Sequence, residues 1–407
     1  MDYRYVDDFK KLGFGLFNHF GLYSVLGQGE WFYYANQTGP ESRRIKESDY
    51  RSLMDRFAIA PDWAMRLAKV AKQAGCRYIT LTTRHHEGFS LYDTHGLSDF
   101  DAPHSASHRD LVKEFVDACH QYDLMPVFYH TVIDWLNPDA KAGRYDRYFA
   151  YLKKSIELLC TNYGEIGGIW FDGTWGLPKG IEFPNEIYQM IHRLQPKAII
   201  TNNTGLSALG QQGAEELDCV TFERGKPFPI GNAKRPIAGE VCEGISDHWG
   251  YAKEDLCVKS FPELLSLLID CRRNGCNLLL NAGLMENGFV SPNELPVLLA
   301  LGRWLEVNKA IILDATPSNI QAENADIFEK DGSYYAVIKG VPMCTNSNVT
   351  RMKETKRVVL KTDKKICDAV WLDNNEAVKM DPDGTFFAWP FDYGYSYSAR
   401  IARFTLK

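Results

Sequence analysis

The sequence predicts a distorted (β/α)8 barrel followed by a small antiparallel β-sandwich domain. Short apolar runs alternate with helical patterns over most of the 407 residues. Runs such as Gly168–Asp172 and Cys276–Asn281 are almost continuously apolar, as strands covered on both faces of a parallel sheet are. After about Ile312 the pattern changes to short alternating or aromatic runs separated by turn residues, which indicates a different, antiparallel unit.

The apolar runs of the first part supply the strands of the barrel. In chain order they are Gly15–Phe20, Tyr78–Thr83, Met125–His130, Gly168–Asp172, Ala198–Asn203, Cys219–Glu223, Ile237–Cys242 and Asn277–Asn281. The helical patterns between and after them are Pro61–Ala74, Arg109–Tyr122, Arg144–Tyr163, Asn185–Leu194, Pro262–Arg273 and Pro292–Asn308. Eight strands with intervening helices over about 250 residues or more match a (β/α)8 barrel.

Two departures from a regular barrel are expected. The connections after Asn203 and after Glu223 are rich in proline and glycine, so we expect helices to be missing there. A doubly wound open sheet is the alternative architecture, but no GxGxxG follows an early strand. We therefore predict a barrel over residues 1–312 and a β-sandwich over residues 313–407.

Two helix starts carry a capping-box pattern. Ser260 and Ser291 are each followed three residues later by a glutamate, with a proline in the first turn. In this pattern the serine side chain and the glutamate side chain satisfy each other's backbone N–H groups. We expect helices to begin after both serines.

Composition excludes several classes of protein. The 52 acidic and 46 basic residues give a formal charge of −6 without a basic stripe, so we expect no nucleic-acid partner. No apolar run approaches 18 residues, and the N-terminal sequence carries acids where a signal peptide needs an apolar stretch, so we expect no membrane association. The ten cysteines form no CxxC or zinc spacing, which favours reduced thiols and a cytoplasmic protein.

Polar residues end nearly every predicted strand. They are His19, His85 with His86, Tyr129 with His130, Asp172, Asn202 with Asn203, Glu223, Glu240 with Glu243, and Asn281. The carboxyl ends of all strands of a (β/α)8 barrel meet at one mouth, where active sites form. A single polar residue at a strand end is commonly a core residue whose hydrogen bonds are all made within the protein. Polar residues at the ends of nearly all the strands instead predict one shared polar site.

Two carboxylates stand out among these residues. Asp172 in GIWFDG and Glu223 in CVTFERG each follow an apolar strand, where an ionised acid needs partners because desolvation costs several kcal/mol. The structural alternatives are a turn cap at Gly173 for Asp172 and an ion pair with Arg224 for Glu223. Two carboxylates at one mouth are the pair that glycoside hydrolysis needs, and Glu240 competes for the second position.

The adjacent His85 and His86 do not predict a metal site, because neighbouring residues of a strand point to opposite faces. A kink at the strand end would let both reach sugar hydroxyls. Trp31 and Trp170 are either platforms for an apolar sugar face or core residues. No GxSxG, P-loop or HExxH motif is present, and we expect neither a metal nor an organic cofactor.

Taken together, the motifs resemble glycoside hydrolase family 29, the α-L-fucosidases. FGLFNHFGLYSVLGQGEWF is similar to the opening strand and loop of that family, and AGCRYITLTTRHHEGFSLYDT to its paired-histidine strand. GGIWFDG resembles its nucleophile strand, NGCNLLLNAGLMENGFV its last barrel strand, and LGRWLEVNKAII its closing helix. The resemblance spans about residues 12–313.

The resemblance implies a retaining exo-glycosidase that removes terminal α-L-fucose from fucosylated oligosaccharides or glycoconjugates, on a barrel with a C-terminal β-sandwich. By position, Asp172 matches the nucleophile and Glu223 the general acid/base, with Glu240 as the fallback. The substrate-binding positions of the family fall on His19, Trp31, His85, His86, Tyr129 and Trp170. The resemblance implies no cofactor.

The sequence departs from the family pattern in places. Phe20 replaces a tryptophan, Gly239 replaces another before Glu240, and NNTGLSALGQQ holds no counterpart of a family arginine. These changes affect the expected leaving-group preference and the assignment of the acid/base. They do not affect the assignment of the nucleophile. The alternatives are another retaining glycosidase or a transfucosylase on the same barrel, or a non-catalytic fucose-binding protein; an oligomer is compatible with all of them.

Overall fold

The computed structural model describes residues 3–37, 40–41, 44–230, 234–342, 355–381 and 383–407. Contacts between its elements divide the chain into two compact units. The first comprises residues 1–259 and 276–299, and the second comprises residues 260–275 and 300–407. No helix in these described ranges combines the length and apolarity that crossing a bilayer requires.

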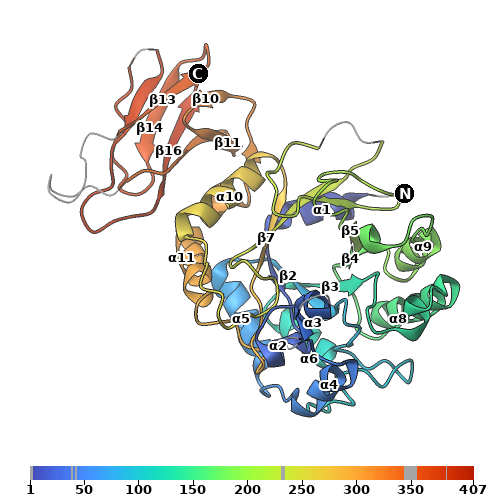
Figure 1. Ribbon diagram of the computed structural model, residues 1–407. Coiled ribbons are helices and arrows are strands. Elements are labelled where there is room, and N and C mark those ends of the chain that lie inside the picture. The colour runs from blue at the N-terminus through green and yellow to red at the C-terminus, as the bar shows by residue number, and fades with distance from the viewer. Residues whose placement is uncertain (1–2, 38–39, 42–43, 231–233, 343–354, 382) are drawn as a thin grey trace. The chain divides into compact units, whose positions relative to one another are not determined.

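Eight parallel strands close into a barrel in the first unit, as predicted (Figure 1). The barrel closes where β1 pairs in parallel with β8, with Phe17 opposite Asn281. The strands are β1 (Phe14–Asn18), β2 (Tyr78–Arg84), β3 (Met125–Thr131), β4 (Gly168–Asp172), β5 (Ile199–Asn202), β6 (Cys219–Thr221), β7 (Ala238–Gly244) and β8 (Asn277–Asn281).

Buried aromatic and aliphatic side chains fill the interior of the barrel, as is usual for eight strands. The interior cluster includes Phe17, Tyr129, Trp170, Cys242 and Leu279. The rings of Tyr129 and Trp170 stack at 5.5 Å with an interplanar angle of 21°. This stack connects the middle of the barrel to its mouth.

Helices cover the outside of the barrel, and short ones build the loops around its mouth. The outer helices α5 and α6 pack together, as do α8 and α9, which lie side by side in Figure 1. The helices of the first part are α1 (Arg4–Leu12), α2 (Tyr23–Leu26), α3 (Phe32–Gln37), α4 (Glu47–Arg51), η2 (Ser52–Arg56), α5 (Trp63–Ala74), α6 (Leu111–Gln121), α7 (Pro138–Lys141), α8 (Tyr145–Thr161), η3 (Thr174–Gly176) and α9 (Asn185–Leu194).

The barrel is distorted where the sequence predicts. Residues 203–218, between β5 and β6, contain no helix, and neither do the described residues between β6 and β7. Helix α1, which the apolar pattern did not predict, buries Val6 and Phe9 against the interior cluster. The side chain of Asn277, at the start of β8, donates to the carbonyl of Phe9 and fixes α1 at the amino ends of the strands.

The two predicted capping boxes have different outcomes. Ser260 and Glu263 form one at the start of α10 (Phe261–Arg273), with the Ser260 N–H donating to Glu263 Oε2 at 2.8 Å. The box at Ser291 is a wrong prediction. Helix α11 begins at Leu295 and ends at Ile312, and Glu294 instead accepts a hydrogen bond from Ser246 at 2.8 Å.

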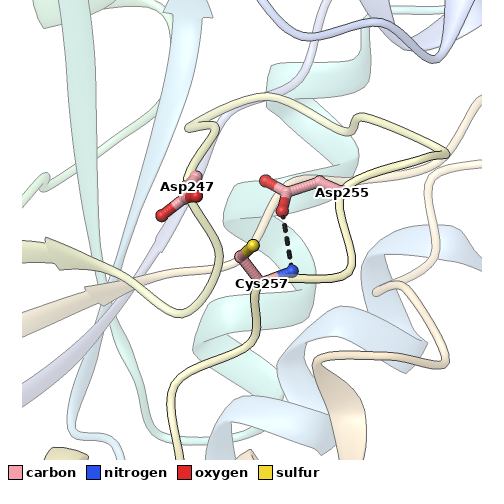
Figure 2. Close-up of side chains that lie close together, drawn as sticks. All are labelled: Asp247, Asp255 and Cys257. Carbon is pink, nitrogen blue, oxygen red and sulfur yellow. Dashed lines mark hydrogen bonds between the residues drawn. The ribbon is translucent and has the colours of Figure 1, made fainter.

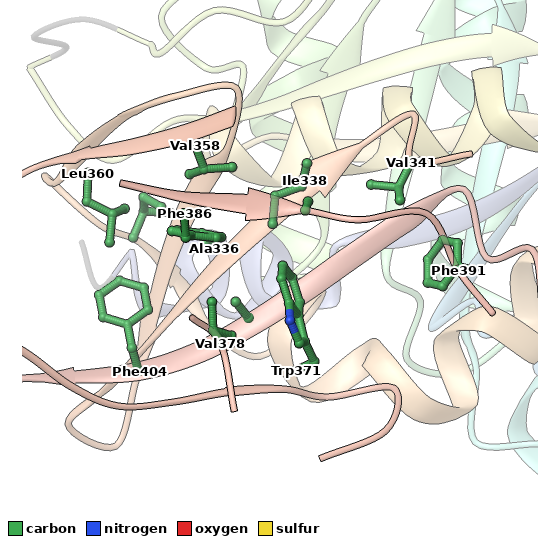
Figure 3. Packing of buried hydrophobic residues seen from close by; sticks show 13 residues of the cluster. Ala336, Ile338, Val341, Val358, Leu360, Trp371, Val378, Phe386, Phe391 and Phe404 are labelled. Atoms are coloured by element: carbon green, nitrogen blue, oxygen red, sulfur yellow. The ribbon is translucent and has the colours of Figure 1, made fainter. Parts of the chain in front are cut away.

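The second unit contains two antiparallel sheets around a common core. One sheet has the order β10-β13-β15 and the other β14-β16-β12-β11-β9. The strands are β9 (Thr316–Pro317), β10 (Gln321–Glu323), β11 (Asp326–Lys330), β12 (Ser333–Lys339), β13 (Lys356–Lys361), β14 (Ile366–Trp371), β15 (Thr385–Ala388) and β16 (Ala399–Leu406). Figure 3 shows Val358 and Phe386 of one sheet packed with Ile338 and Phe404 of the other.

The division of the chain differs from a single boundary after residue 312. Helix α10 groups with the sandwich because it contacts β9, β11 and β16. Lys339 of β12 reinforces this packing through ion pairs with Asp270 of α10 and, at 3.0 Å, with Asp326. In the sequence α10 occupies the place of a barrel helix between β7 and β8.

Candidate active site

Polar side chains from five strand ends meet at the mouth of the barrel. Asp172 is the last residue of β4, and Glu223 follows β6 by two residues. Asn203 comes directly after β5, His86 follows β2, and Tyr129 lies near the end of β3. Their direct contacts define the candidate site.

The Asp172 carboxylate lies at the centre of this arrangement, and its side chain is 13% exposed. Its Oδ1 accepts from the Gly173 N–H at 2.8 Å, from Trp175 Nε1 at 3.0 Å and from Asn203 Nδ2 at 3.2 Å. Its Oδ2 accepts from the Tyr129 hydroxyl at 3.0 Å and lies 3.4 Å from His86 Nε2. The turn cap at Gly173 is therefore present in addition to four other contacts.

These contacts set the charge of Asp172. Burial acts to raise the pKa of this carboxyl, but the hydrogen bonds from His86, Trp175 and Tyr129 outweigh burial and lower the pKa below its usual value. Asp172 is thus held as a carboxylate. A carboxylate at a strand end, facing the mouth, can act as a nucleophile.

Glu223 has the opposite tendency. Burial raises the pKa of its carboxyl, the nearby Asp172 charge raises it further, and the hydrogen bond from Asn203 opposes them without reversing the shift. Glu223 is not paired with Arg224 as the structural alternative supposed, because the described ion pair of Arg224 is with Glu243, at 3.8 Å. A carboxyl with a raised pKa is suited to donate a proton.

Asn203 holds the two carboxylates close together. Its Nδ2 donates to Glu223 Oε2 at 2.7 Å and to Asp172 Oδ1 at 3.2 Å. Because one nitrogen contacts both oxygens, those oxygens are separated by at most about 6 Å, below the roughly 6.5–9.5 Å of inverting glycosidases and compatible with the 5–5.5 Å of retaining ones. Asn203 was expected at a strand end but not as a bridge.

The predicted histidines line one wall. His19 Nδ1 lies 2.7 Å from Asn281 Oδ1, and His85 stacks on Tyr129 at 5.6 Å. Burial lowers the pKa of His19 to about 4 and that of His85 well below its usual value. Both rings are therefore neutral near pH 7 and can donate or accept hydrogen bonds.

The adjacent His85 and His86 do reach the same site, with ring centroids 4.3 Å apart. The ladder between β2 and β3 shifts register between Thr82 and Arg84, and both histidines follow the last residue of β2. Because both histidines lie beyond the end of the strand, the strict alternation of strand residues does not separate them.

Trp31 lies in a cluster of aromatic side chains at the edge of the site. Its ring is 5.5 Å from His86, 5.6 Å from Tyr34, 5.0 Å from Trp135 and 6.1 Å from Trp175. Sequence reasoning missed Trp135 and Trp175 as site residues. The position of Trp175, three residues after Asp172, was the available signal.

Two predicted residues lie deeper in the barrel. Trp170 is buried, stacks beneath Tyr129 and donates to Glu240 Oε1 at 2.9 Å. Glu240 accepts from the Tyr78 hydroxyl at 2.6 Å through its other oxygen. The expectation that Glu240 ends its strand is wrong, because β7 continues to Gly244 and Glu240 pairs with Asn277, the first residue of β8.

His130 and Asn202 also point away from the carboxylates. His130 contacts Tyr92 and Ser155, and Asn202 donates to the Tyr188 hydroxyl. Alternation along a strand places their neighbours Tyr129 and Asn203 inside instead.

The loop after β7 contains a cluster of Asp247, Asp255 and Cys257, whose nearest ligand atoms lie within 4.8 Å of one another (Figure 2). Asp255 accepts from the Cys257 N–H at 3.1 Å and contacts His248 Nδ1 at 2.8 Å. Internal hydrogen bonds explain this grouping, so we assign it no part in the site.

Comparison with known proteins agrees with this arrangement. The family model described as α-L-fucosidase matches residues 2–310. Tissue α-L-fucosidase of Macaca fascicularis is 28% identical over 335 residues, which cover 77% of this chain and 70% of that protein. The human tissue α-L-fucosidase is 26% identical over 335 residues, with the same coverage of 77% and 70%.

Solved structures share the fold over the whole chain. α-L-Fucosidase isoenzyme 1 from Paenibacillus thiaminolyticus has a TM-score of 0.83 at 25% identity and covers 99% of both chains. An α-L-fucosidase of family GH29 from Bacteroides thetaiotaomicron has a TM-score of 0.80 at 20% identity, covering 100% of this chain and 96% of that one. The chain therefore belongs to the α-L-fucosidase family of glycoside hydrolases.

Proposed function

We propose that this fucosidase is a retaining exo-enzyme that releases terminal α-L-fucose from fucosylated glycans by double displacement. Asp172 is the nucleophile and Glu223 is the general acid/base. The observation that carries the proposal is the Asn203 bridge, since it keeps an ionised and a protonatable carboxyl within about 6 Å of each other.

In the first step a carboxylate oxygen of Asp172 attacks the anomeric carbon of fucose. The glycosidic C–O bond breaks, and the proton of Glu223 passes to the departing oxygen, which leaves as an alcohol. The products are a fucosyl ester on Asp172 and an ionised Glu223. The five contacts of Asp172 keep it charged and oriented before the attack.

In the second step the Glu223 carboxylate removes a proton from water as the water oxygen attacks the same carbon. The ester C–O bond breaks, which restores the Asp172 carboxylate and a protonated Glu223. Two inversions give net retention. The neutral His19 and His85, together with His86, are the side chains that we assign to hydrogen bonds with the sugar hydroxyls.

Relatives give this mechanism further support. A solved structure from Bacteroides thetaiotaomicron, with a TM-score of 0.80, is described as a trapped covalent intermediate of a GH29 α-L-fucosidase with 2-fluoro-fucosyl fluoride. In the present chain the same reagent is expected to label Asp172. Displacement of the anomeric fluoride leaves the fluorine at C2 in place, so mass spectrometry of the digested protein should find one 2-fluoro-fucosyl adduct on the peptide that contains this residue.

Substrate class and stereochemistry can be tested together. We expect release of p-nitrophenol from the α-L-fucoside and little from the corresponding galactoside or xyloside, with α-L-fucose as the first product by proton NMR. Formation of β-L-fucose first would contradict the retaining mechanism. Fucosylated alcohols formed when an acceptor is added would reveal transfucosylation.

A further inference from the structure

The second unit contains a cavity of about 390 Å³ that the proposed mechanism does not use. β14 and β15 are each the outer strand of their sheet, and the cavity is lined by residues that follow β14, by β15 and by residues that follow β15. Its volume lies in the range of roughly 300–1,000 Å³ that small-molecule sites occupy. The lining includes Trp371, Glu376, Asp381, Phe387, Trp389 and Arg400.

Two aromatic rings of this lining are open to solvent. Phe387 is 41% exposed and Trp389 is 61% exposed, whereas their neighbours Phe386 and Ala388 are buried in the core of the sandwich. The alternation of a strand therefore turns both exposed rings to the outer face of β15. Single exposed aromatic residues are common, but two that line one cavity indicate a surface that binds a ligand.

A buried guanidinium belongs to the same lining. Arg400 is 7% exposed, and its Cζ lies 4.3 Å from the ring centroid of Trp371 and 5.6 Å from that of Phe391, both labelled in Figure 3. Its Nε donates to Asp373 Oδ1 at 3.0 Å, and its Nη1 donates to the carbonyl of Trp389 at 3.0 Å. These are the hydrogen bonds that Arg400 makes to described residues, which leaves Nη2 as a donor for a ligand.

Backbone hydrogen bonds hold Trp389 in place. Arg400 binds its carbonyl, and two residues later the Phe391 N–H donates to the carbonyl of Pro342 at 2.9 Å. The chain is thus fixed on both sides of Pro390. An aromatic ring on a fixed backbone loses little conformational freedom when a ligand stacks on it.

The chemistry of the lining fits a neutral sugar ring. Aromatic rings bind the flat C–H face of a pyranose, and its hydroxyls can donate to the carboxylates of Glu376 and Asp381 and accept from Arg400. Acids beside the guanidinium disfavour an anion. A second copy of the chain would need about 800 Å² of complementary surface, whereas this site is a hollow lined with charges of both signs.

We propose that this cavity is a second, non-catalytic glycan-binding site, and that it takes a neutral pyranose other than fucose from the glycan that carries fucose. Such a site would retain the enzyme on its substrate between turnovers. The inference goes beyond the proposed function, because it involves neither Asp172 nor Glu223.

A glycan without fucose tests the proposal, because the active site then has no fucose to bind. The probe is gastric mucin from which sialic acid and fucose have been removed, immobilised for biolayer interferometry with the full chain. We expect the wild-type protein to bind and Trp389→Ala to raise the apparent Kd about three- to tenfold, because one stacked ring is lost. Trp389→Phe keeps a ring and should stay within about twofold of wild type.

The matched control is Tyr393→Ala, at an 81% exposed tyrosine of the same segment that lies outside the cavity lining. It should leave the apparent Kd unchanged. Thermal unfolding of each variant verifies that it folds.

Turnover separates this site from the active site. The kcat/KM for p-nitrophenyl α-L-fucoside should be the same in Trp389→Ala and in wild type, since both carboxylates of the mouth are intact. If the proposed function fails, the wild-type protein does not hydrolyse this substrate, yet mucin binding and its weakening in Trp389→Ala are still expected.

Three results would overturn the glycan site. One is a wild-type protein that does not bind the mucin, or binds it no better than Trp389→Ala. Another is binding that persists after periodate has opened the terminal sugar rings of the mucin, which would make the partner a protein. The third is a loss of binding that accompanies dissociation of an oligomer in light scattering, which would make this surface an interface between copies of the chain.

Discussion

Tyr129 and Trp170, whose rings stack, each donate a hydrogen bond to a different carboxylate. The Tyr129 hydroxyl donates to Asp172 at the mouth of the barrel, and the Trp170 indole donates to Glu240 in its interior. Both acids are shielded from solvent, yet the pKa of Asp172 is lowered whereas burial raises that of Glu240 to about 7. The surroundings of the barrel mouth therefore reverse the effect that burial has on the pKa of a carboxyl.

The difference lies in the number and kind of donors. Asp172 has five contacts, including a backbone N–H and an imidazole, whereas Glu240 has Tyr78 and Trp170. Two neutral donors do not compensate the desolvation of a carboxylate, whereas five contacts do. Burial alone therefore does not indicate which acid of this barrel is reactive.

The largest expected effect separates the two carboxylates by activity. Asp172→Asn should reduce kcat for p-nitrophenyl α-L-fucoside by about a thousandfold or more, because the amide cannot form the fucosyl ester. Glu240→Gln is the matched control at the other end of the stack and should stay within about threefold of wild type. Thermal unfolding of both variants verifies that they fold. Similar losses in both would mean that the interior carboxyl takes part in the reaction.

The next effect concerns the second carboxyl of the mouth. Glu223→Gln should lower kcat/KM about a hundred- to thousandfold for a fucosyl disaccharide, whose sugar leaving group needs protonation. The loss should be smaller for p-nitrophenyl α-L-fucoside, because nitrophenolate departs without a proton. Initial rates on both substrates measure the contrast. Equal losses would assign Glu223 a role other than proton donation.

Periodicity and strand-end residues sufficed to predict the barrel, its missing helices and the position of Asp172. Each of these depends on local pattern, since an apolar strand followed by an acid fixes both burial and direction. Glu223 was also found this way, although β6 ends two residues earlier than expected.

Long-range contacts account for what the sequence did not reveal. The sequence does not show that Glu240 lies in the interior of the barrel whereas Glu223 lies at its mouth. The depth of Glu240 depends on the register of β7 against β8, and no local pattern encodes that register. Glu294 follows Ser291 at capping-box spacing but bonds to Ser246, 48 residues away. Trp135 and Trp175 join the site through loops whose shapes are set by their neighbours.

A smaller effect tests the protonation of Glu240 through stability. Its pKa is about 7 in the folded protein against an ordinary 4.5, so the folded state binds the proton more tightly than the unfolded state. The stability that this provides is complete below pH 4.5 and is lost as the pH rises towards 7. Relative to Glu240→Gln, wild type should lose roughly 2–3 kcal/mol over this range.

Urea unfolding at several pH values between 4.5 and 7.5 measures this difference. Using the glutamine variant as the reference cancels the other buried acids with raised pKa values, such as Glu87 and Glu294. Parallel stability curves for the two proteins would show that Glu240 keeps one protonation state throughout.

The smallest effect concerns the Asn203 bridge and the pH dependence of kcat/KM. Activity should rise with pH as Asp172 ionises and fall as Glu223 loses its proton, and the pKa shifts of the two groups widen the active range on both sides. Asn203 stabilises the ionised form of Glu223, so Asn203→Ala should move the alkaline limb upward by about one pH unit. Asn202→Ala removes the adjacent amide, which contacts Tyr188 and Thr174, and should leave that limb in place. The readout is the midpoint of the alkaline limb and not the rate, so a general loss of packing in either variant does not imitate the result. An alkaline limb that stays fixed in Asn203→Ala would mean that a group other than Glu223 produces this limb.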